Sequence, residues 1–548
     1  MKQTKKWLGL IIAFALILTT VKTIPAAAQS SPVNSDGAVL DWTADICKVP
    51  GEWGNTTTSP IIIGDSIYAA CDNYLYKLEK ATGKIEAEIE LAEYINYSYT
   101  LTYGDDMIFV PINNGKVQAV STKTDKSLWV SESFDGFQSN SPLTYENGKL
   151  YSAIAKDSYD SNTWEYLGSE GYVFCLDTAD GDSSKTSETK KVLWKSDLDK
   201  EGHYWAKPTI SGNYVLVGTD ASSIFVFEKS TGELKSSIPV NGQIRSGILK
   251  DPDAAYFYAV TKSATLYRFK INSDGSYEEL SSLDLTPADA NATSTNCTST
   301  PTILNGNLYL FNSYTNAAYE TTGLASVVTA DMKIIRQIPL NRSFSQSTAL
   351  VIPAKLGAEV YFTQNNNPSG IYHFKDFDNT KIDTIFEPET NLQQYCCSSV
   401  VTDENGTLFY SNDSGTIFSV GKKLEPSPNP SPSAIPTVSE FPSKTPAANN
   451  IGSTSASVKK PEKVKKLTVK KSGKKVIIKW KKVSGTVKYQ VMVKKGTGKF
   501  KKLAVTSKTS LKSKLKKGSY KIKVRAYQLA NGQKIYGNYS SVKKLKIK

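Results

Sequence analysis

Histidine is scarce in this chain, and its scarcity limits the chemistry that the sequence can support. Only two of the 548 residues are histidines, His203 and His373. Neither has a second ligand at a spacing typical of a metal site, and a haem-attaching C-x-x-C-H motif is absent. The residues also offer no nucleophile and base in a recognisable arrangement. The sequence therefore predicts no metal site and no catalytic residues.

Long hydrophobic runs are absent after the first 28 residues. The chain begins with the basic stretch "MKQTKK", continues with the apolar run "WLGLIIAFALILTTV", and offers an A-x-A cleavage site in "PAAAQS" after Ala28. This order is typical of a secretory signal peptide over 1–28. We therefore expect a secreted protein, in which the six cysteines are free to form disulfides.

Acidic residues are nearly absent from the C-terminal part. Residues 459–548 contain 31 Lys and Arg against one acid, Glu462, which gives a net charge of +30. The signal peptide adds +4, so a total of +14 leaves −20 on residues 29–458. Between the two parts lies a Pro- and Ser-rich tract over 424–460 that cannot bury a core. The sequence predicts two oppositely charged bodies joined by an extended linker.

Helical periodicity is hard to find in residues 29–423, where a strand-like repeat occurs instead. Eight stretches such as "TTTSPIII", "CTSTPTIL" and "CCSSVVT" recur at intervals of 40 to 66 residues, and each is followed by further short alternating strands. Four short strands per unit are typical of a propeller blade. The eighth unit lacks its fourth strand, and residues 38–46 supply a spare one. We therefore expect an all-β, eight-bladed β-propeller over 29–423, closed by strand 38–46.

Aligning the repeats on their fifth residue places one side chain of each unit around the propeller axis. These are Thr56, Tyr97, Gln138, Tyr204, Ile244, Cys297, Gln346 and Cys396. Aromatic and amide side chains mixed with an arginine are typical of a site for a sugar, a peptide end or another polar ligand. The candidate ligand-binding residues are Tyr97, Gln138, Tyr204, Trp205, Arg245, Gln346 and Tyr395. The alternative is that these side chains only fill the channel.

The cysteines leave their pairing open, because six allow about 15 pairings. Cys396 and Cys397 are adjacent, so they either bond to each other or have separate partners. Cys396 shares the repeat position of Cys297, and Cys47 follows the closing strand. Cys47, Cys297, Cys396 and Cys397 are therefore the disulfide candidates, while Cys175 is interpreted as a core residue.

Three turns of the repeat carry a recognisable motif. "KLEKATGKIEA" (77–87), "AVSTKTDKSLW" (119–129) and "VFEKSTGELKS" (226–236) resemble the A-x-D-x-x-T-G-K-x-x-W repeat of quinoprotein (PQQ-like) β-propellers. The final Trp is present at Trp129, and Trp194 and Trp42 occupy comparable positions. The resemblance implies that these tryptophans pack between neighbouring blades.

The enzymes of that family hold PQQ and Ca²⁺ on the axis, with a vicinal disulfide against the cofactor. Cys396–Cys397 is similar to that last element only, and it opens the last blade, whereas the family's pair lies early in the chain. No Asp, Glu and Asn cluster matches the calcium and base positions. We therefore expect no cofactor, and PQQ with calcium is the alternative.

Residues 461–548 resemble a fibronectin type III domain. Trp480 occupies the position of the family's buried tryptophan with Tyr489 beside it, and Tyr520 that of the tyrosine corner. The resemblance implies a small sandwich whose lysines face solvent. Lysine-rich domains of this kind are similar to those on surface proteins of Gram-positive bacteria.

These observations favour a secreted, non-catalytic surface protein that acts as a monomer. Its propeller is expected to bind an unknown protein or glycan. Its basic domain, 459–548, is expected to attach to an anionic cell-wall polymer or a membrane surface. Nucleic acid is not expected, because no recognition motif for it is present. A PQQ-dependent dehydrogenase is the first alternative, and a propeller hydrolase or lyase the second.

Overall fold

The computed structural model divides the chain into two compact units, Met1–Pro426 and Ser427–Lys548. Its described residues are 37–47, 57–95, 100–163, 165–182, 184–185, 188–341, 344–377 and 381–422 in the first unit, and 461–472, 475–483, 488–496, 500–506, 508–530 and 533–547 in the second. The predicted signal peptide (1–28) and the predicted linker (424–460) lie outside the described residues, as does residue 423. Within these residues, no helix has the length and apolar character needed to span a membrane.

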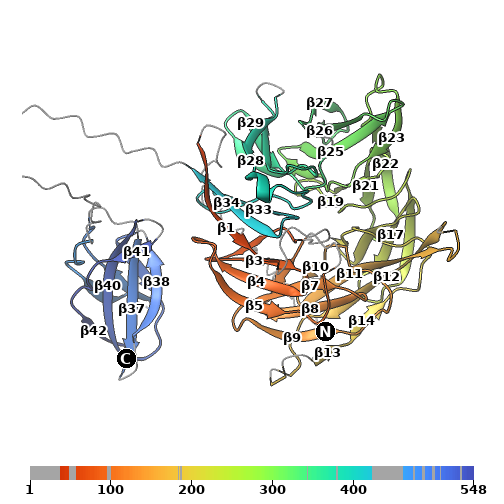
Figure 1. Ribbon diagram of the computed structural model, residues 1–548. Helices are drawn as coiled ribbons and strands as arrows, with labels where there is room; N and C mark the ends of the chain where they lie inside the picture. Colours follow the sequence, from red (N-terminus) through yellow and green to blue (C-terminus); the bar gives the residue numbers. More distant parts are fainter. Residues whose placement is uncertain are drawn as a thin grey trace, which may run out of the picture. The chain divides into compact units, whose positions relative to one another are not determined.

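The described part of the first unit is a β-propeller of eight sheets, one for each predicted repeat, and Figure 1 shows the sheets arranged in a ring. The first four sheets contain β2 (Ile61–Ile63), β3 (Ser66–Cys71), β4 (Tyr74–Glu79) and β5 (Ile85–Glu90); β6 (Thr102–Gly104), β7 (Met107–Ile112), β8 (Lys116–Ser121), β9 (Lys126–Ser131) and β13 (Glu188–Lys190); β10 (Thr144–Glu146), β11 (Lys149–Tyr159), β12 (Tyr166–Asp177) and β14 (Val192–Lys195); and β15 (Thr209–Ser211), β16 (Tyr214–Gly218), β17 (Ser223–Glu228) and β18 (Leu234–Pro239).

The other four sheets complete the ring, with one 3-10 turn, η1 (Thr390–Leu392), beside them. They contain β19 (Leu249–Lys250), β20 (Tyr256–Val260), β21 (Thr265–Ile271) and β22 (Tyr277–Asp284); β23 (Ala292–Asn296), β24 (Thr302–Leu304), β25 (Asn307–Asn316), β26 (Thr321–Thr329) and β27 (Ile334–Pro339); β28 (Leu350–Ala354), β29 (Gly357–Phe362), β30 (Ile371–Lys375) and β31 (Asp383–Phe386); and β32 (Val401–Thr402), β33 (Leu408–Asn412), β34 (Thr416–Lys422) and β1 (Ala38–Asp45).

Burial along the strands follows their place in each sheet. The second strands β7 and β16 are buried at every residue, because neighbouring sheets cover both of their faces. The fourth strand β18 instead buries Ile238 between exposed residues, as expected at the rim. The core therefore consists of apolar clusters between adjacent blades rather than one central cluster.

The ring is closed by the N-terminal strand, as the sequence predicts. β1 pairs antiparallel with β34, so the last sheet gains its fourth strand from the beginning of the chain. The backbone NH of Ser399 donates to Ser59 Oγ at 2.8 Å, and the Ser411 hydroxyl donates to the Thr58 carbonyl at 2.9 Å. These bonds join the last blade to the first and leave fewer free edges for association.

Three tryptophans lock neighbouring blades together. The indole NH of Trp42, Trp129 and Trp194 donates to a backbone carbonyl in the next blade, at 3.2, 3.3 and 2.9 Å. Gly83 lies against the Trp42 ring with a φ of +71°, and any Cβ there would collide with the ring. The turn therefore requires glycine, and the packing role implied by the motif is present in this chain.

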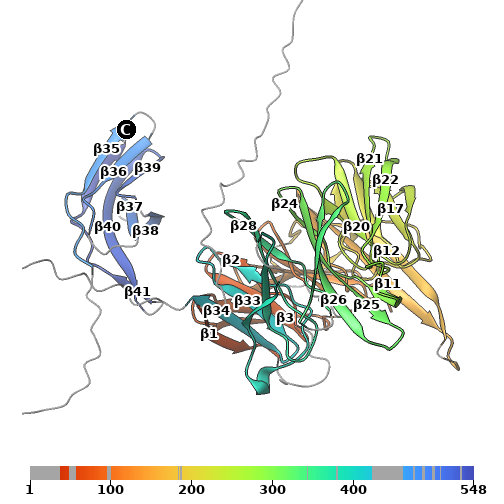
Figure 2. The same ribbon diagram turned by 90° about the horizontal axis from the view of Figure 1, so that it is seen from above.

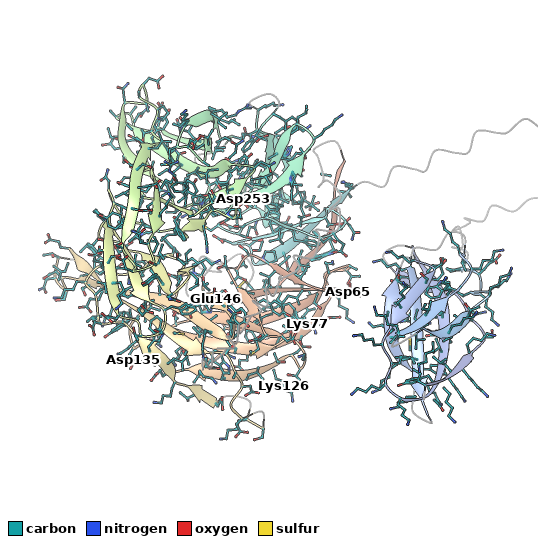
Figure 3. All side chains as sticks on the ribbon, turned by 180° about the vertical axis from the view of Figure 1, so that it is seen from behind. Asp65, Lys77, Lys126, Asp135, Glu146 and Asp253 are labelled. Carbon is teal, nitrogen blue, oxygen red and sulfur yellow. A yellow bond between two sulfur atoms is a disulfide. The ribbon has the colours of Figure 1, made fainter. Side chains whose placement is uncertain are left out.

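Ion pairs also cross between blades in the first unit. Lys77 Nζ lies 2.8 Å from Asp125 Oδ2 of the second blade, and Lys229 Nζ lies 2.8 Å from Glu146 Oε2 of the third. Lys77 and Glu146 are labelled in Figure 3. Much of the charge of the first unit is thus used within the molecule.

The second unit is a β-sandwich of two sheets, which can be followed in Figure 2. One contains β35 (Thr468–Ser472), β36 (Lys475–Lys479) and β39 (Ser510–Ser513), and the other β38 (Lys501–Thr506), β37 (Lys488–Lys495), β40 (Gly518–Ala530), β41 (Gln533–Tyr536) and β42 (Lys543–Ile547). Trp480 is buried with its ring 5.3 Å from that of Tyr489, and the Tyr520 hydroxyl donates to the Lys516 carbonyl at 2.7 Å. Membership of the fibronectin type III family stays a prediction.

Candidate functional site

A cavity of about 530 Å³ on the first unit brings together most of the candidate residues. Gln138, Tyr204, Trp205, Arg245, Gln346 and Tyr395 line it, while Tyr97 lies outside the described residues. A smaller cavity of about 70 Å³ shares Trp205, Arg245 and Gln346 and is also lined by Pro142, Thr300 and Ser399. Six of the seven candidate ligand-binding residues therefore meet in one pocket, whereas Ile244, Cys297 and Cys396 of the predicted ring do not line it and Thr56 lies outside the described residues. Binding of a ligand there stays a prediction.

The repeat alignment is wrong by one residue in the third and seventh units. The thiols of Cys297 and Cys396 donate to the carbonyls of Phe311 and Ser411, which lie in the second strands of their blades. In the seventh unit the corresponding bond, to the Thr363 carbonyl at 2.6 Å, comes from Ser345 rather than Gln346. The side chains of Cys297, Ser345 and Cys396 thus point back to the second strand. The residue that follows each of them faces the pocket, because successive side chains of an extended chain point to opposite sides.

The same shift exchanges the roles of neighbouring residues in the third unit. Thr144 pairs with Tyr151 in the third blade just as Thr209 pairs with Leu216 in the fourth, so Thr144 and Thr209 are equivalent. Counting back five residues from each, the residue equivalent to Tyr204 is Ser139 and not Gln138. Asn140 then becomes the residue that faces the axis, and it lines both cavities. Gln138 still lines the larger cavity, from its outer side.

One wall of the pocket is built around a buried ion pair. Arg245 donates to Asp220 from Nε at 2.9 Å and from Nη2 at 2.5 Å, and its guanidinium lies 5.0 Å from the Tyr204 ring centre and 5.6 Å from that of Trp205. Burial raises the pKa of Asp220, and the arginine opposes that rise. The pair fixes Arg245 and leaves it little free charge for a ligand.

A buried histidine supports the same wall from behind. His203 Nε2 lies 2.7 Å from the Asp199 carboxylate and Nδ1 lies 2.9 Å from the Gly218 carbonyl, so both ring nitrogens face acceptors. Burial alone lowers the pKa of His203, but these acceptors outweigh it and the pKa is raised. The residue two positions on, Trp205, has a φ of +53°, a left-handed conformation that the packing around it must hold in place.

The opposite wall carries amides and a carboxyl group. Gln346 Oε1 accepts hydrogen bonds from Asn365 Nδ2 at 2.5 Å and from the Cys397 thiol at 3.0 Å, and its Nε2 donates to Thr298. Asp413 lines the pocket beside them, and burial raises the pKa of its carboxyl group to about 7. This carboxyl group therefore takes up a proton at a higher pH than an exposed aspartate does.

Three buried polar atoms of the pocket residues make no hydrogen bond of good geometry among the described residues, although the Tyr204 and Asp157 side chains interact with each other. They are Tyr204 Oη, Asn140 Oδ1 and Asp157 Oδ1. Burial raises the pKa of Tyr204, and the Asp157 carboxylate adds to that rise. Because an unpaired buried polar atom costs roughly 1–3 kcal/mol, these positions favour a polar ligand that pairs with them.

Five pocket residues were not predicted as ligand-binding residues, and one of them, Cys397, was named only as a disulfide candidate. Asn140 was missed because of the alignment error, and Asp157, Asn365 and Asp413 because they come from a different part of each blade. These three lie at or after the end of a second strand, where the turn to the third strand begins. An acid or amide recurring directly after the second strand of a repeat would have indicated them.

Of the four disulfide candidates, Cys47 forms a disulfide, whereas Cys297, Cys396 and Cys397 do not. The only disulfide among the described residues joins Cys47 to Cys71, with 5.5 Å between their Cα atoms. It connects the segment after the closing strand to β3 of the first blade. Cys297 and Cys396 are buried thiols, because each points back to its own second strand instead of toward a neighbouring cysteine.

Comparisons with known proteins support the fold. No protein-family model matches the chain, and no curated protein matches it. A solved quinohemoprotein alcohol dehydrogenase from Comamonas testosteroni is similar, with a TM-score of 0.51, 11% identity, and coverage of 73% of this chain and 79% of that one. BamB from Moraxella catarrhalis has a TM-score of 0.46 and 12% identity, with coverage of 70% of this chain and 99% of that one. The computationally designed protein Ika8 has a TM-score of 0.47 and 11% identity, with coverage of 69% of this chain and 98% of that one. Because the identity is only 11%, the similarity to the dehydrogenase supports the propeller fold and carries no statement about activity.

The pocket residues do not fit the cofactor set of the quinoprotein enzymes. Arg245 is held by Asp220, and the Asp157 carboxylate on the wall would oppose an anionic quinone. Among the described residues, the only group of three His, Cys, Asp or Glu ligand atoms is Cys47, Cys71 and Asp72, whose two sulfurs form the disulfide. No reaction step through PQQ follows from this arrangement.

Proposed function

We propose that the first unit is a non-catalytic binding platform of a secreted protein, and that its pocket holds a neutral saccharide. The observation that carries this proposal is the set of buried polar atoms Tyr204 Oη, Asn140 Oδ1 and Asp157 Oδ1 of the pocket residues, none of which makes a hydrogen bond of good geometry to a described residue. Sugar hydroxyls donate and accept hydrogen bonds and match such a set. The half-exposed Trp205 and Tyr395 offer ring faces for the apolar side of a sugar.

We further propose that the second unit attaches the protein to an anionic surface, with cell-wall polymer as the preferred partner. Residues 459–548 carry 31 basic residues against one acid, and Figure 3 shows long side chains projecting from the sandwich. In such an arrangement many weak contacts add, and none is individually necessary.

Calorimetric titration of the full-length mature protein tests the saccharide proposal. The probes are glucose and N-acetylglucosamine with their β-1,4-linked dimers, and a parallel arm contains PQQ with Ca²⁺ and a dye-linked alcohol oxidation assay. Saturable binding of a saccharide without its cleavage supports the proposal. Cleavage would favour a hydrolase or lyase, PQQ binding with dye reduction would favour the dehydrogenase, and no binding of any probe would contradict the proposal.

A further inference from the structure

The hairpin formed by β11 and β12 is longer than most of its neighbours. β11 has 11 residues and β12 has 12, whereas the corresponding strands β7 and β8 of the preceding blade have six each. Figure 1 and Figure 2 both show this hairpin projecting beyond the adjacent sheets. Its extension buries little apolar surface, so the propeller core does not explain it.

The base of the extension belongs to the pocket, and its next residues are exposed aromatics. Asp157 lines the cavity, and Tyr159 lies two residues further along the strand, a step of about 7 Å toward the same face. Tyr159 packs against Tyr166 of β12, with ring centres 5.7 Å apart. The two side chains are 51% and 48% exposed.

The tyrosine pair is electrostatically linked to the pocket wall. Burial raises the pKa of Tyr166, and the charges of Asp157, Asp220 and Arg245 also act on it, which places the ring near the ion pair of the wall. The Tyr159 hydroxyl points to Asp157 Oδ2 at 3.4 Å. The two half-exposed rings therefore adjoin Asp157 at the pocket wall, although neither ring lines the cavity itself.

We propose that these two rings form a second subsite, and that the ligand is an oligosaccharide with one sugar in the pocket and the following sugar on Tyr159 and Tyr166. This inference rests on the saccharide-binding function proposed above. Exposed tyrosines supply flat contact area at low entropic cost. The position of the rings beside Asp157 favours a chain of sugar units over an unrelated partner at the hairpin.

The test is a calorimetric length series on the full-length mature protein, with N-acetylglucosamine and glucose as monomers and as β-1,4-linked dimers, trimers and tetramers. We expect the dimer to bind at least about fivefold more tightly than the monomer, in line with one or two ring contacts. Tyr166→Ala should remove most of that gain and leave monomer affinity unchanged. Asp157→Ala should weaken every length.

Tyr319→Ala is the matched control, because Tyr319 is 91% exposed on the other long hairpin, between β25 and β26. It should change no affinity. Equal affinity for all lengths, or an unchanged length gain in Tyr166→Ala, would overturn the subsite while leaving the pocket function in place. No binding of any saccharide, monomers included, would instead count against the proposed function itself. An effect of Tyr319→Ala equal to that of Tyr166→Ala would also overturn the assignment.

Discussion

Many charged side chains of the propeller form ion pairs, whereas most of those in the sandwich have no oppositely charged partner among the described residues. Arg245 binds Asp220, Lys77 binds Asp125 and His203 binds Asp199. In the described part of the sandwich the one ion pair is Lys465–Glu462, at 3.6 Å between exposed side chains. The first unit therefore uses charge to position individual residues, and the second presents charge to its surroundings. Single substitutions should matter in the propeller, and ionic strength should matter for the sandwich.

The largest effect is expected where a buried residue joins two blades. Trp129→Ala removes a fully buried ring and its bond to the Thr178 carbonyl, and it should lower the free energy of unfolding of the propeller by about 4 kcal/mol. Differential scanning calorimetry of the full chain checks this, with the sandwich transition as internal reference. Trp42→Ala, at a half-buried position with the same type of bond, should cost less. Equal costs would show that burial does not determine the strength of the interlock.

The disulfide should contribute slightly less. Replacing Cys47 and Cys71 with serine opens a cross-link between residues separated by 24 positions, and the loss of loop closure predicts about 3 kcal/mol of destabilisation. Chemical denaturation of the propeller measures it. Cys175→Ser is the control, because it alters a buried thiol without opening a cross-link. Equal losses in both proteins would assign the effect to core packing.

Salt concentration should affect binding by the sandwich much more than binding by the propeller. Binding of the full chain to walls that carry teichoic acid should weaken on the order of a hundredfold between about 50 and 500 mM salt, because screening and counterion release reduce polyanion binding. Sedimentation measures the bound fraction, and anionic vesicles test the membrane alternative. Saccharide affinity of the propeller should change little over the same range. Wall binding that persists at high salt would contradict attachment by charge.

The smallest effect concerns pH. The pKa of His203 is raised in the folded protein, so its contribution to stability is complete below the unfolded pKa of about 6.5 and is lost as pH rises through the folded value. The melting temperature of the propeller should therefore fall at alkaline pH, and His203→Gln should reduce this slope. Asp413→Asn is the control. The pKa of Asp413 is raised to about 7, so this group changes the pH dependence of stability below about pH 7 and not at alkaline pH. An unchanged alkaline slope in His203→Gln would show that the histidine is neutral.

The repeat pattern could be predicted because its signals are local. Alternating strands, the spare strand at 38–46 and the tryptophans of the motif each occur within a few residues, and all three appear in the structure. The register of Gln138 and Gln346 could not be predicted, because neighbouring Ser, Asn and Gln residues fit either position until Ser345 is seen bonded to the Thr363 carbonyl.

The candidate site could be predicted only in part for a related reason. Tyr204, Trp205 and Arg245 precede the first strands of their blades, and Trp205 and Arg245 share a repeat position. Asp157, Asn365 and Asp413 come from the other end of the second strands, and only the folded blade brings the two sets together. The Cys47–Cys71 disulfide likewise depends on ring closure, which places residues of the last and first blades side by side.

The measurement that tests the account most directly is a titration of the full-length mature protein and its Asp157→Ala variant with the tetramer of N-acetylglucosamine. The account predicts saturable one-site binding that weakens at least about tenfold in the variant, because a hydrogen-bond acceptor of the pocket is removed. Equal affinity in both proteins, or no binding to either, would contradict the axial pocket as a saccharide site.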